Sequence, residues 1–173
     1  MKILKPADGT YPAYMQNYVR LVPEDGELMV HLHETQNAFE KYILALPESK
    51  HTYSYAEGKW TIKEVLVHLT DAERIFIYRA LRYARKDETP LPGFDENTYV
   101  PASHANERSI TNILSESKAV RAASIAFIET LNENDLSCGG VNTSGTSTTV
   151  LAIVNIVLGH QLHHWNVIKE RYV

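Results

Sequence analysis

The sequence lacks two features that would point to particular classes of function. It contains a single cysteine, Cys138, so a disulfide within one chain is excluded, which fits a reducing compartment. It has no run of lysine and arginine, and its formal net charge is −4. Binding to nucleic acid without sequence preference needs a basic face. We therefore expect no nucleic-acid partner.

Long apolar runs are also missing. The longest apolar stretch, Val150 to Gly159, contains Asn155 and is shorter than the roughly 20 residues that a membrane-spanning helix needs. Two lysines and a proline interrupt the first six residues, so they do not resemble the apolar core of a secretory signal. We expect a cytoplasmic protein with no membrane partner.

Helical periodicity dominates what is present. The 173 residues fit one domain, 1–173, in which residues 1–22 form an irregular lead-in with a short helix near 14–21. Apolar residues recur at steps of three and four in four segments, roughly 24–46, 61–85, 110–133 and 149–171. At the start of the second segment, Thr61 and Glu64 match a capping box, with Trp60 and Val65 as a hydrophobic staple. The residues expected on the inward faces are Leu28, Leu32, Phe39, Ile43 and Leu46; Val65, Leu69, Ala72, Phe76 and Ala80; Ile113, Val120, Ser124, Phe127 and Leu131; and Val150, Val154, Val157, Leu158, Gln161, Trp165 and Ile168.

The connections between these segments define the fold class. The connection 86–108 is rich in proline and is long for a compact domain, a property often associated with function. A second connection, about 137–147, is rich in Gly, Ser and Thr. Four long helices with no strand pattern between them predict an all-α four-helix bundle with a long connection between the second and third helices. That connection would permit a crossover instead of strict up-down order.

Three of the eight histidines are candidates for a shared site. His160 and His164 are four residues apart, a spacing that places two imidazoles on one face of a helix, where they can bind one ion. The spacing also occurs by chance. His68 lies in the apolar stripe of the second helix, where a buried imidazole needs a partner for each ring nitrogen. The alternatives are a metal site between facing helices and core histidines that hydrogen-bond to neighbouring side chains.

The other histidines give weaker signals. His163 is adjacent to His164 and therefore points about 100° away from it, so it could lie on the surface, beside the site or toward a substrate. His31, His33, His51 and His104 have polar neighbours in the sequence, and we expect them to be exposed to solvent.

Two sequence motifs carry a resemblance to a known family. Residues 58–69, Gly-Lys-Trp-Thr-Ile-Lys-Glu-Val-Leu-Val-His-Leu, and residues 159–164, Gly-His-Gln-Leu-His-His, resemble the DinB-like superfamily, as do 80–85 and 92–96. This group includes DNA-damage-inducible DinB proteins, bacillithiol transferases and mycothiol-dependent isomerases. The resemblance implies a four-helix bundle that binds a divalent metal, zinc or nickel, through His68, His160 and His164. It also implies a homodimer. Some thiol-dependent members have a carboxylate in place of one histidine of the pair, which this sequence does not.

Three neutral histidines would leave a tetrahedral ion one open position, which is the pattern of catalytic sites. A water bound there becomes a nucleophile near neutral pH, whereas a thiol would bind as thiolate. Asp71 is the candidate general base. Asp71 or Glu64 could also accept the free ring N–H of His68, and Asp71 could instead be only a solvated helix residue. The other candidates near the site are Glu64, which could instead be only the capping residue, Gln161, Asp95 and Tyr99. Cys138 has no basic neighbour and is not expected to be a nucleophile.

Three functional hypotheses follow, and in the enzymatic one the partner is a small-molecule substrate. The first is a metal-dependent enzyme that transfers a low-molecular-weight thiol to a small electrophile, or a metal-dependent hydrolase. The second is a metal-binding, stress-related protein without turnover. The third is a structural bundle that binds metal only adventitiously. The sequence does not decide between them.

Overall fold

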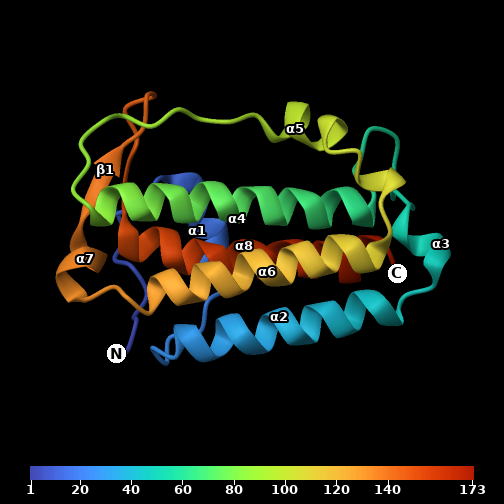
Figure 1. The fold of residues 1–173 in the computed structure, drawn as a ribbon, viewed down its shortest axis with the longest axis horizontal. Coiled ribbons are helices and arrows are strands. Elements are labelled where there is room, and N and C mark those ends of the chain that lie inside the picture. The colour runs from blue at the N-terminus through green and yellow to red at the C-terminus, as the bar shows by residue number, and fades with distance from the viewer.

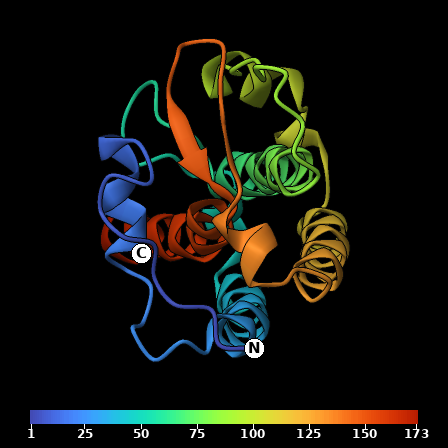
Figure 2. The same ribbon diagram turned by 90° about the vertical axis from the view of Figure 1, so that its left-hand side faces the viewer.

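Four long helices form the body of the molecule, as predicted. The computed structural model describes residues 1–173. The helices are α2 (Leu28–Ala45), α4 (Ile62–Ala84), α6 (Ile110–Ile128) and α8 (Val150–Arg171) (Figure 1). Both α4 and α2 pack against α6 and α8, so α2 and α4 occupy opposite corners of the bundle (Figure 2). The predicted four-helix bundle is confirmed.

The connection between α4 and α6 is a crossover. Residues 85–109 run back along the whole length of the bundle, so α4 and α6 point in the same direction (Figure 1). The connection is not wholly irregular, because it contains α5 (Glu96–Ala102) and the 3-10 turn η2 (Ala105–Glu107). The Asp95 side chain caps α5 by accepting a hydrogen bond from the Asn97 backbone N–H at 2.9 Å. This connection covers one side of α4.

Local signals fix both ends of α4. The Thr61 hydroxyl accepts a hydrogen bond from the Glu64 N–H at 3.2 Å, and the Glu64 carboxylate accepts one from the Thr61 N–H at 2.7 Å, so the capping box is present. At the other end, the N–H groups of Lys86 and Asp87 donate back to the Tyr83 and Arg82 carbonyls. This is a Schellman motif, in which Lys86 adopts the left-handed backbone with φ 58°.

The core follows the predicted stripes closely, with one shift. The predicted inward residues of α2, α4 and α8 are buried or partly buried. On α6, however, Val120 and Phe127 are only partly buried, and Arg121 and Ile128 occupy buried positions next to them. The inner face of α6 is therefore centred one residue further along the chain, because a charged residue, Arg121, points inward.

Short elements complete the fold at both ends. The lead-in contains η1 (Ala13–Met15) and α1 (Gln16–Val19), which confirms a short helix there, and α1 packs on α8. A Cβ atom on Gly159 of α8 would overlap the backbone carbonyl oxygen of Tyr18, so the glycine lets α1 approach. The other short helices are α3 (Glu48–His51) and α7 (Glu133–Ser137). None of the helices is both long and apolar enough to cross a membrane.

Two short strands differ from the all-helical expectation. β1 (Gly139–Val141) and β2 (Ser147–Thr149) pair antiparallel, with Gly139 opposite Thr149. The Asn142 side chain organises the turn by accepting hydrogen bonds from the Ser144 and Thr146 N–H groups. Strands of three residues are too short to produce a readable alternation of apolar and polar residues.

Candidate metal centre

The three histidines singled out in the sequence meet between α4 and α8. The Nε2 atom of His160 lies 3.2 Å from Nε2 of His68 and 3.1 Å from Nε2 of His164. Ligands bound to tetrahedral zinc at 2.0–2.1 Å are separated by about 3.3 Å. Both distances are close to this spacing, and all three donor atoms lie within 4.8 Å of one another. One face of α4 provides His68, and one face of α8 provides the other two.

Hydrogen bonding alone cannot satisfy this arrangement. A neutral imidazole nitrogen offers either one N–H or one lone pair. Nε2 of His160 faces two other Nε2 atoms, so one of the two contacts is left without a good hydrogen bond. A cation accepts all three lone pairs at once. The donor set thus fits a divalent metal better than it fits a cluster of histidines joined by hydrogen bonds.

Burial keeps the three rings in the neutral form that binds metals. It lowers the pKa of His68 to about 4 and that of His164 to about 3. It also places the pKa of His160 well below the ordinary value, and the neighbouring imidazoles add to this effect. At neutral pH each ring consequently has a free lone pair.

Aromatic rings enclose the imidazoles. The Trp60 ring lies 4.8 Å from the His68 ring between centroids, and Tyr18 and Phe76 lie 5.1 and 5.6 Å from His160. These contacts restrict the orientation of the imidazoles. They also remove water from around the rings, which is the cause of the lowered pKa values.

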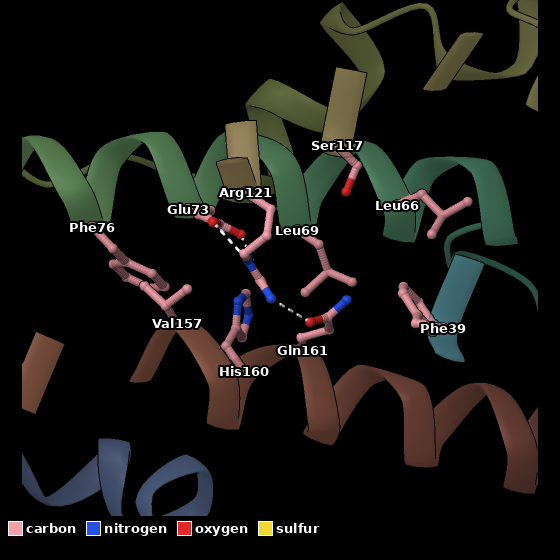
Figure 3. A pocket seen from close by; sticks show the side chains of 10 residues that line it. All are labelled: Phe39, Leu66, Leu69, Glu73, Phe76, Ser117, Arg121, Val157, His160 and Gln161. Carbon is pink, nitrogen blue, oxygen red and sulfur yellow. Dashed lines mark hydrogen bonds and ion pairs between the residues drawn. The ribbon is translucent and has the colours of Figure 1, made fainter. Parts of the chain in front are cut away.

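A buried polar network lies behind His160 (Figure 3). Arg121 of α6 donates to both carboxylate oxygens of Glu73 on α4, at 2.9 and 2.8 Å, and to Oε1 of Gln161 on α8, at 2.9 Å. It also donates to the Leu32 carbonyl of α2 at 3.2 Å. One guanidinium thus ties together all four long helices next to the histidines, and in particular the two helices that carry them.

A cavity opens on the other side of the histidines. Its volume is about 390 Å³. It is lined by the three histidines and by Tyr14, Tyr18, Trp60, Ala72, Phe76, Arg79, Gly93, Phe94, Glu96, Asn142 and His163. The residues from 93 to 96 belong to the crossover connection, which therefore forms one wall. The size is typical of a pocket for a small molecule.

The structure places the predicted accessory carboxylates elsewhere. Asp71 pairs with Arg74 at 3.2 Å, and Arg74 continues to Glu116 on α6 at 2.7 Å, so this carboxylate does not line the cavity. Burial raises the pKa of Asp71 while Arg74 opposes that shift. Glu64 acts in the capping box. We therefore do not retain Asp71 or Glu64 as general bases.

The other residues predicted near the site also have roles that differ from those expected. Gln161 belongs to the network of Arg121 and makes no hydrogen bond to a histidine. Asp95 caps α5, and Tyr99 packs against Phe94 with ring centroids 5.4 Å apart. The connection does reach the cavity, but through Phe94 and Glu96.

Glu96 is the carboxylate of the cavity that sequence reasoning missed. It is partly buried and has no hydrogen bond or ion pair within the chain, and its charge acts to raise the pKa of His68. Because Glu96 follows a capping Asp95 in a proline-rich connection, nothing in its neighbourhood marks it as facing the histidines. Its position depends on how the crossover folds over α4.

The other histidines separate into three environments. His163 lines the cavity and packs edge-on against Tyr18, with ring centroids 5.3 Å apart. His33 and His104 are exposed and His31 is partly exposed. The prediction for His51 was wrong. It is buried, and its Nε2 lies 3.2 Å from the Ile43 carbonyl, because α3 folds this ring back onto the last turn of α2.

Fold and site together define a helical bundle with a three-histidine centre at the wall of a small-molecule cavity. The DinB superfamily matches residues 31–168, a range that includes all three histidines. The chain belongs to the DinB superfamily.

Two proteins similar to this chain have names that describe metal-dependent hydrolases. A protein of Oceanobacillus iheyensis, whose name assigns it provisionally to the metal-dependent hydrolases, is 26% identical over 147 residues, covering 80% of this chain and 83% of its own. YfiT from Bacillus subtilis, described as a probable metal-dependent hydrolase with an unusual four-helix bundle topology, is 18% identical, with a TM-score of 0.76 over 96% of this chain and 90% of its own.

Two further solved structures share the fold. The mycothiol-dependent maleylpyruvate isomerase has a TM-score of 0.63 at 13% identity, over 80% of this chain and 57% of its own. A DinB-like protein, YjoA of Bacillus subtilis, has a TM-score of 0.59 at 14% identity, over 83% of this chain and 87% of its own. Similarity at these identities concerns the fold.

Proposed function

We propose that this protein is a metal-dependent hydrolase of a small molecule, with the metal on His68, His160 and His164. The observation that carries the proposal is the convergence of three neutral imidazoles at the wall of a cavity that also contains an unpaired carboxylate. Three protein ligands leave a tetrahedral ion one position, and here that position would face the cavity. Zinc and nickel both suit imidazole ligands.

A bound divalent metal would supply Lewis acidity and would lower the pKa of a coordinated water to about 7. Glu96 is the carboxylate of the cavity, and it can accept a proton from water because no cation of the chain pairs with it. The glutamate side chain is long and flexible, and it stands at the start of α5. It can therefore approach the histidines from the crossover side.

Two tyrosines that line the cavity, Tyr14 and Tyr18, provide hydrogen-bond donors. Burial raises the pKa of Tyr14 and Tyr18, so both hydroxyls are protonated at neutral pH. Neither hydroxyl has a partner within the chain, and both line the cavity. They can therefore donate to a substrate carbonyl or to the negative charge that develops on it during attack by water.

Transfer of a low-molecular-weight thiol is the second candidate. It is supported by the similarity in fold to the mycothiol-dependent isomerase and by the same open position, which would bind a thiolate. Cys138 lies outside the cavity and donates its S–H to the Asn134 carbonyl at 3.3 Å. Any thiol used in the reaction would have to come from solution.

One experiment separates the two reactions. The zinc-loaded or nickel-loaded protein is assayed with an activated ester and with an alkyl halide, each with and without a low-molecular-weight thiol. Hydrolysis predicts ester turnover without thiol, which Glu96→Gln lowers by about 100-fold, in the range expected for loss of a general base. Thiol transfer predicts turnover only when thiol is present. Absence of metal-dependent turnover with either substrate would contradict both.

A further inference from the structure

Arg79 lies on the same face of α4 as the histidine site. His68, Ala72, Phe76 and Arg79 follow one another at steps of three or four residues, and all four line the cavity. The 11-residue separation between His68 and Arg79 corresponds to roughly 16 Å along the helix axis. Helical side chains lean toward the N-terminus of the helix, which is the direction in which His68 lies from Arg79.

The charge of Arg79 has no counter-ion within the chain. Its Nη2 donates to the Pro92 carbonyl at 3.0 Å, and no carboxylate lies within ion-pair distance. The neighbouring arginines of α4 differ in this respect, because Arg74 pairs with Glu116 and Arg82 pairs with Asp87. Arg79 is also partly buried, and its charge acts to lower the pKa of Tyr14 across the cavity.

An unpaired guanidinium in a partly desolvated cavity is well suited to bind an anion. The hydrogen bond to Pro92 uses one hydrogen of Nη2 and orients the planar group. The second Nη2 hydrogen stays free beside the N–H groups of Nε and Nη1, so an edge of the guanidinium still offers two parallel donors. A guanidinium binds carboxylates and phosphates through two parallel hydrogen bonds. The ring of Phe76 and the small side chain of Ala72 form an apolar surface between this cation and His68.

We propose that Arg79 binds an anionic group of the substrate, and that the substrate is an elongated small molecule. Its acid group lies at Arg79, its apolar middle lies over Phe76 and Ala72, and its reacting bond lies at the three histidines. This assignment deepens the proposed function and rests on it for the reaction at the histidines. Glu96, on the crossover side, would repel an acid group placed near the histidines and so favours the same orientation.

Binding can be measured without turnover, because Trp60 lines the cavity. The chain has two tryptophans, so Trp165→Phe leaves Trp60 as the reporter of fluorescence. In this background, 4-phenylbutyrate and 4-phenylbutyramide have matched shapes, and only the first is charged. Phenylpropyl phosphate tests whether phosphate replaces carboxylate. We expect the carboxylate to bind about 10- to 100-fold more tightly than the amide, the range of a charge-assisted hydrogen-bond pair.

Variants assign this preference to Arg79. Arg79→Gln should remove the preference and leave the Kd of the amide unchanged, whereas Arg79→Lys should keep part of it. Arg74→Gln is the matched control on the same helix outside the cavity and should behave as the parent does. Equal Kd values for acid and amide in the parent, or a preference that persists in Arg79→Gln, would overturn the proposal.

Kinetic measurements separate the binding of the acid group by Arg79, which we call the anchor, from the reaction at the histidines. The metal-loaded protein is assayed with 4-nitrophenyl acetate and with the mono-4-nitrophenyl ester of glutaric acid. Arg79→Gln should lower kcat/KM by about 10- to 100-fold for the acidic ester alone. If neither ester reacts but the carboxylate preference is found, the hydrolase proposal fails and the anchor stands. If both esters react, and Arg79→Gln leaves kcat/KM for each ester at the value of the parent, the anchor fails and the hydrolase stands.

Discussion

His160 is the central residue of the histidine cluster, because its Nε2 lies within 3.2 Å of both partners while α8 and α1 bury its ring. We expect His160→Ala to lower the metal content of purified, untagged protein from about one equivalent to near zero, since two remaining ligands bind a divalent ion weakly. His68→Ala and His164→Ala should act in the same direction. Metal analysis by mass spectrometry measures the effect.

The control for this prediction is His104→Ala, which removes an exposed imidazole on the crossover connection. It should leave the metal content unchanged. A His160→Ala protein with the same metal content as the parent would show that the ion binds elsewhere.

The same histidines make the metal-free protein sensitive to acid. Burial holds the pKa of His68 at about 4 and that of His164 at about 3, below the ordinary value of 6.5 that applies after unfolding. As pH falls below about 6.5 the unfolded chain therefore binds protons first, and stability is lost toward pH 4. We expect His68 alone to cost on the order of 2 kcal/mol between about pH 7.5 and about pH 5. Urea unfolding of chelator-treated protein at both pH values measures this loss.

His68→Gln provides the comparison, because glutamine does not titrate. Its free energy of unfolding should fall less than that of the parent over the same pH range. An equal fall in both proteins would mean that other groups cause the acid sensitivity.

Individual residues of the site differ in how far the sequence could predict them. His68 was found because it lies in an apolar stripe, and His160 and His164 were found because they are four residues apart. The family resemblance then implied that the three share one metal ion. Glu96 and Arg79 were not found, because they face the cavity only after the crossover has folded over α4. Arg121 and Glu73 were not found either, since a charged residue is normally read as exposed until its partner on another helix is known.

At the scale of elements, Arg121 sets how α4, α6 and α8 pack around the site. We expect Arg121→Met to lower the free energy of unfolding by about 3–5 kcal/mol, since it leaves the buried Glu73 carboxylate without a cation. The double variant Arg121→Met with Glu73→Leu should recover much of this loss, because no buried charge remains. Urea unfolding followed by far-UV circular dichroism gives both values. A double variant as unstable as the single one would contradict the explanation.

The sequence predicts the long elements correctly and misses most of the short ones. The long helices follow from apolar periodicity combined with capping residues, as the capping box at Thr61 illustrates. The seven residues of α5 span only about two turns and include Pro101, so periodicity does not reveal them. The two strands of the hairpin 139–149 are shorter still, at three residues each. The inner face of α6 lies one residue further along the chain than predicted, because Arg121 points inward.

At the scale of the whole molecule, the metal should stabilise a fold that exists without it. The bundle has an apolar core on both sides of the histidines, so chelation should lower the Tm and leave the helical circular dichroism at room temperature intact. Thermal unfolding with and without chelator tests this expectation. Loss of the helical signal at room temperature after chelation would show that the metal is required for folding.

Association into a homodimer remains a prediction from the family resemblance. Val30 and Leu44 of α2 are 46% and 49% exposed, and Tyr78 and Leu81 of α4 are 49% and 38% exposed, so both helices present apolar side chains to solvent. We expect a dimer mass by light scattering at micromolar protein. A monomer mass under these conditions would contradict the prediction.

The crossover divides the metal ligands between two halves of the chain. His68 lies before residues 85–109, and His160 and His164 lie after them. A break in the backbone between the exposed residues Glu88 and Thr89 would therefore give two pieces, neither of which holds a complete donor set. Mixing the pieces would restore three donors only when both halves pack as in the intact bundle. The protein thus offers a split reporter, in which the spectrum of bound cobalt signals that two separately made halves have found each other.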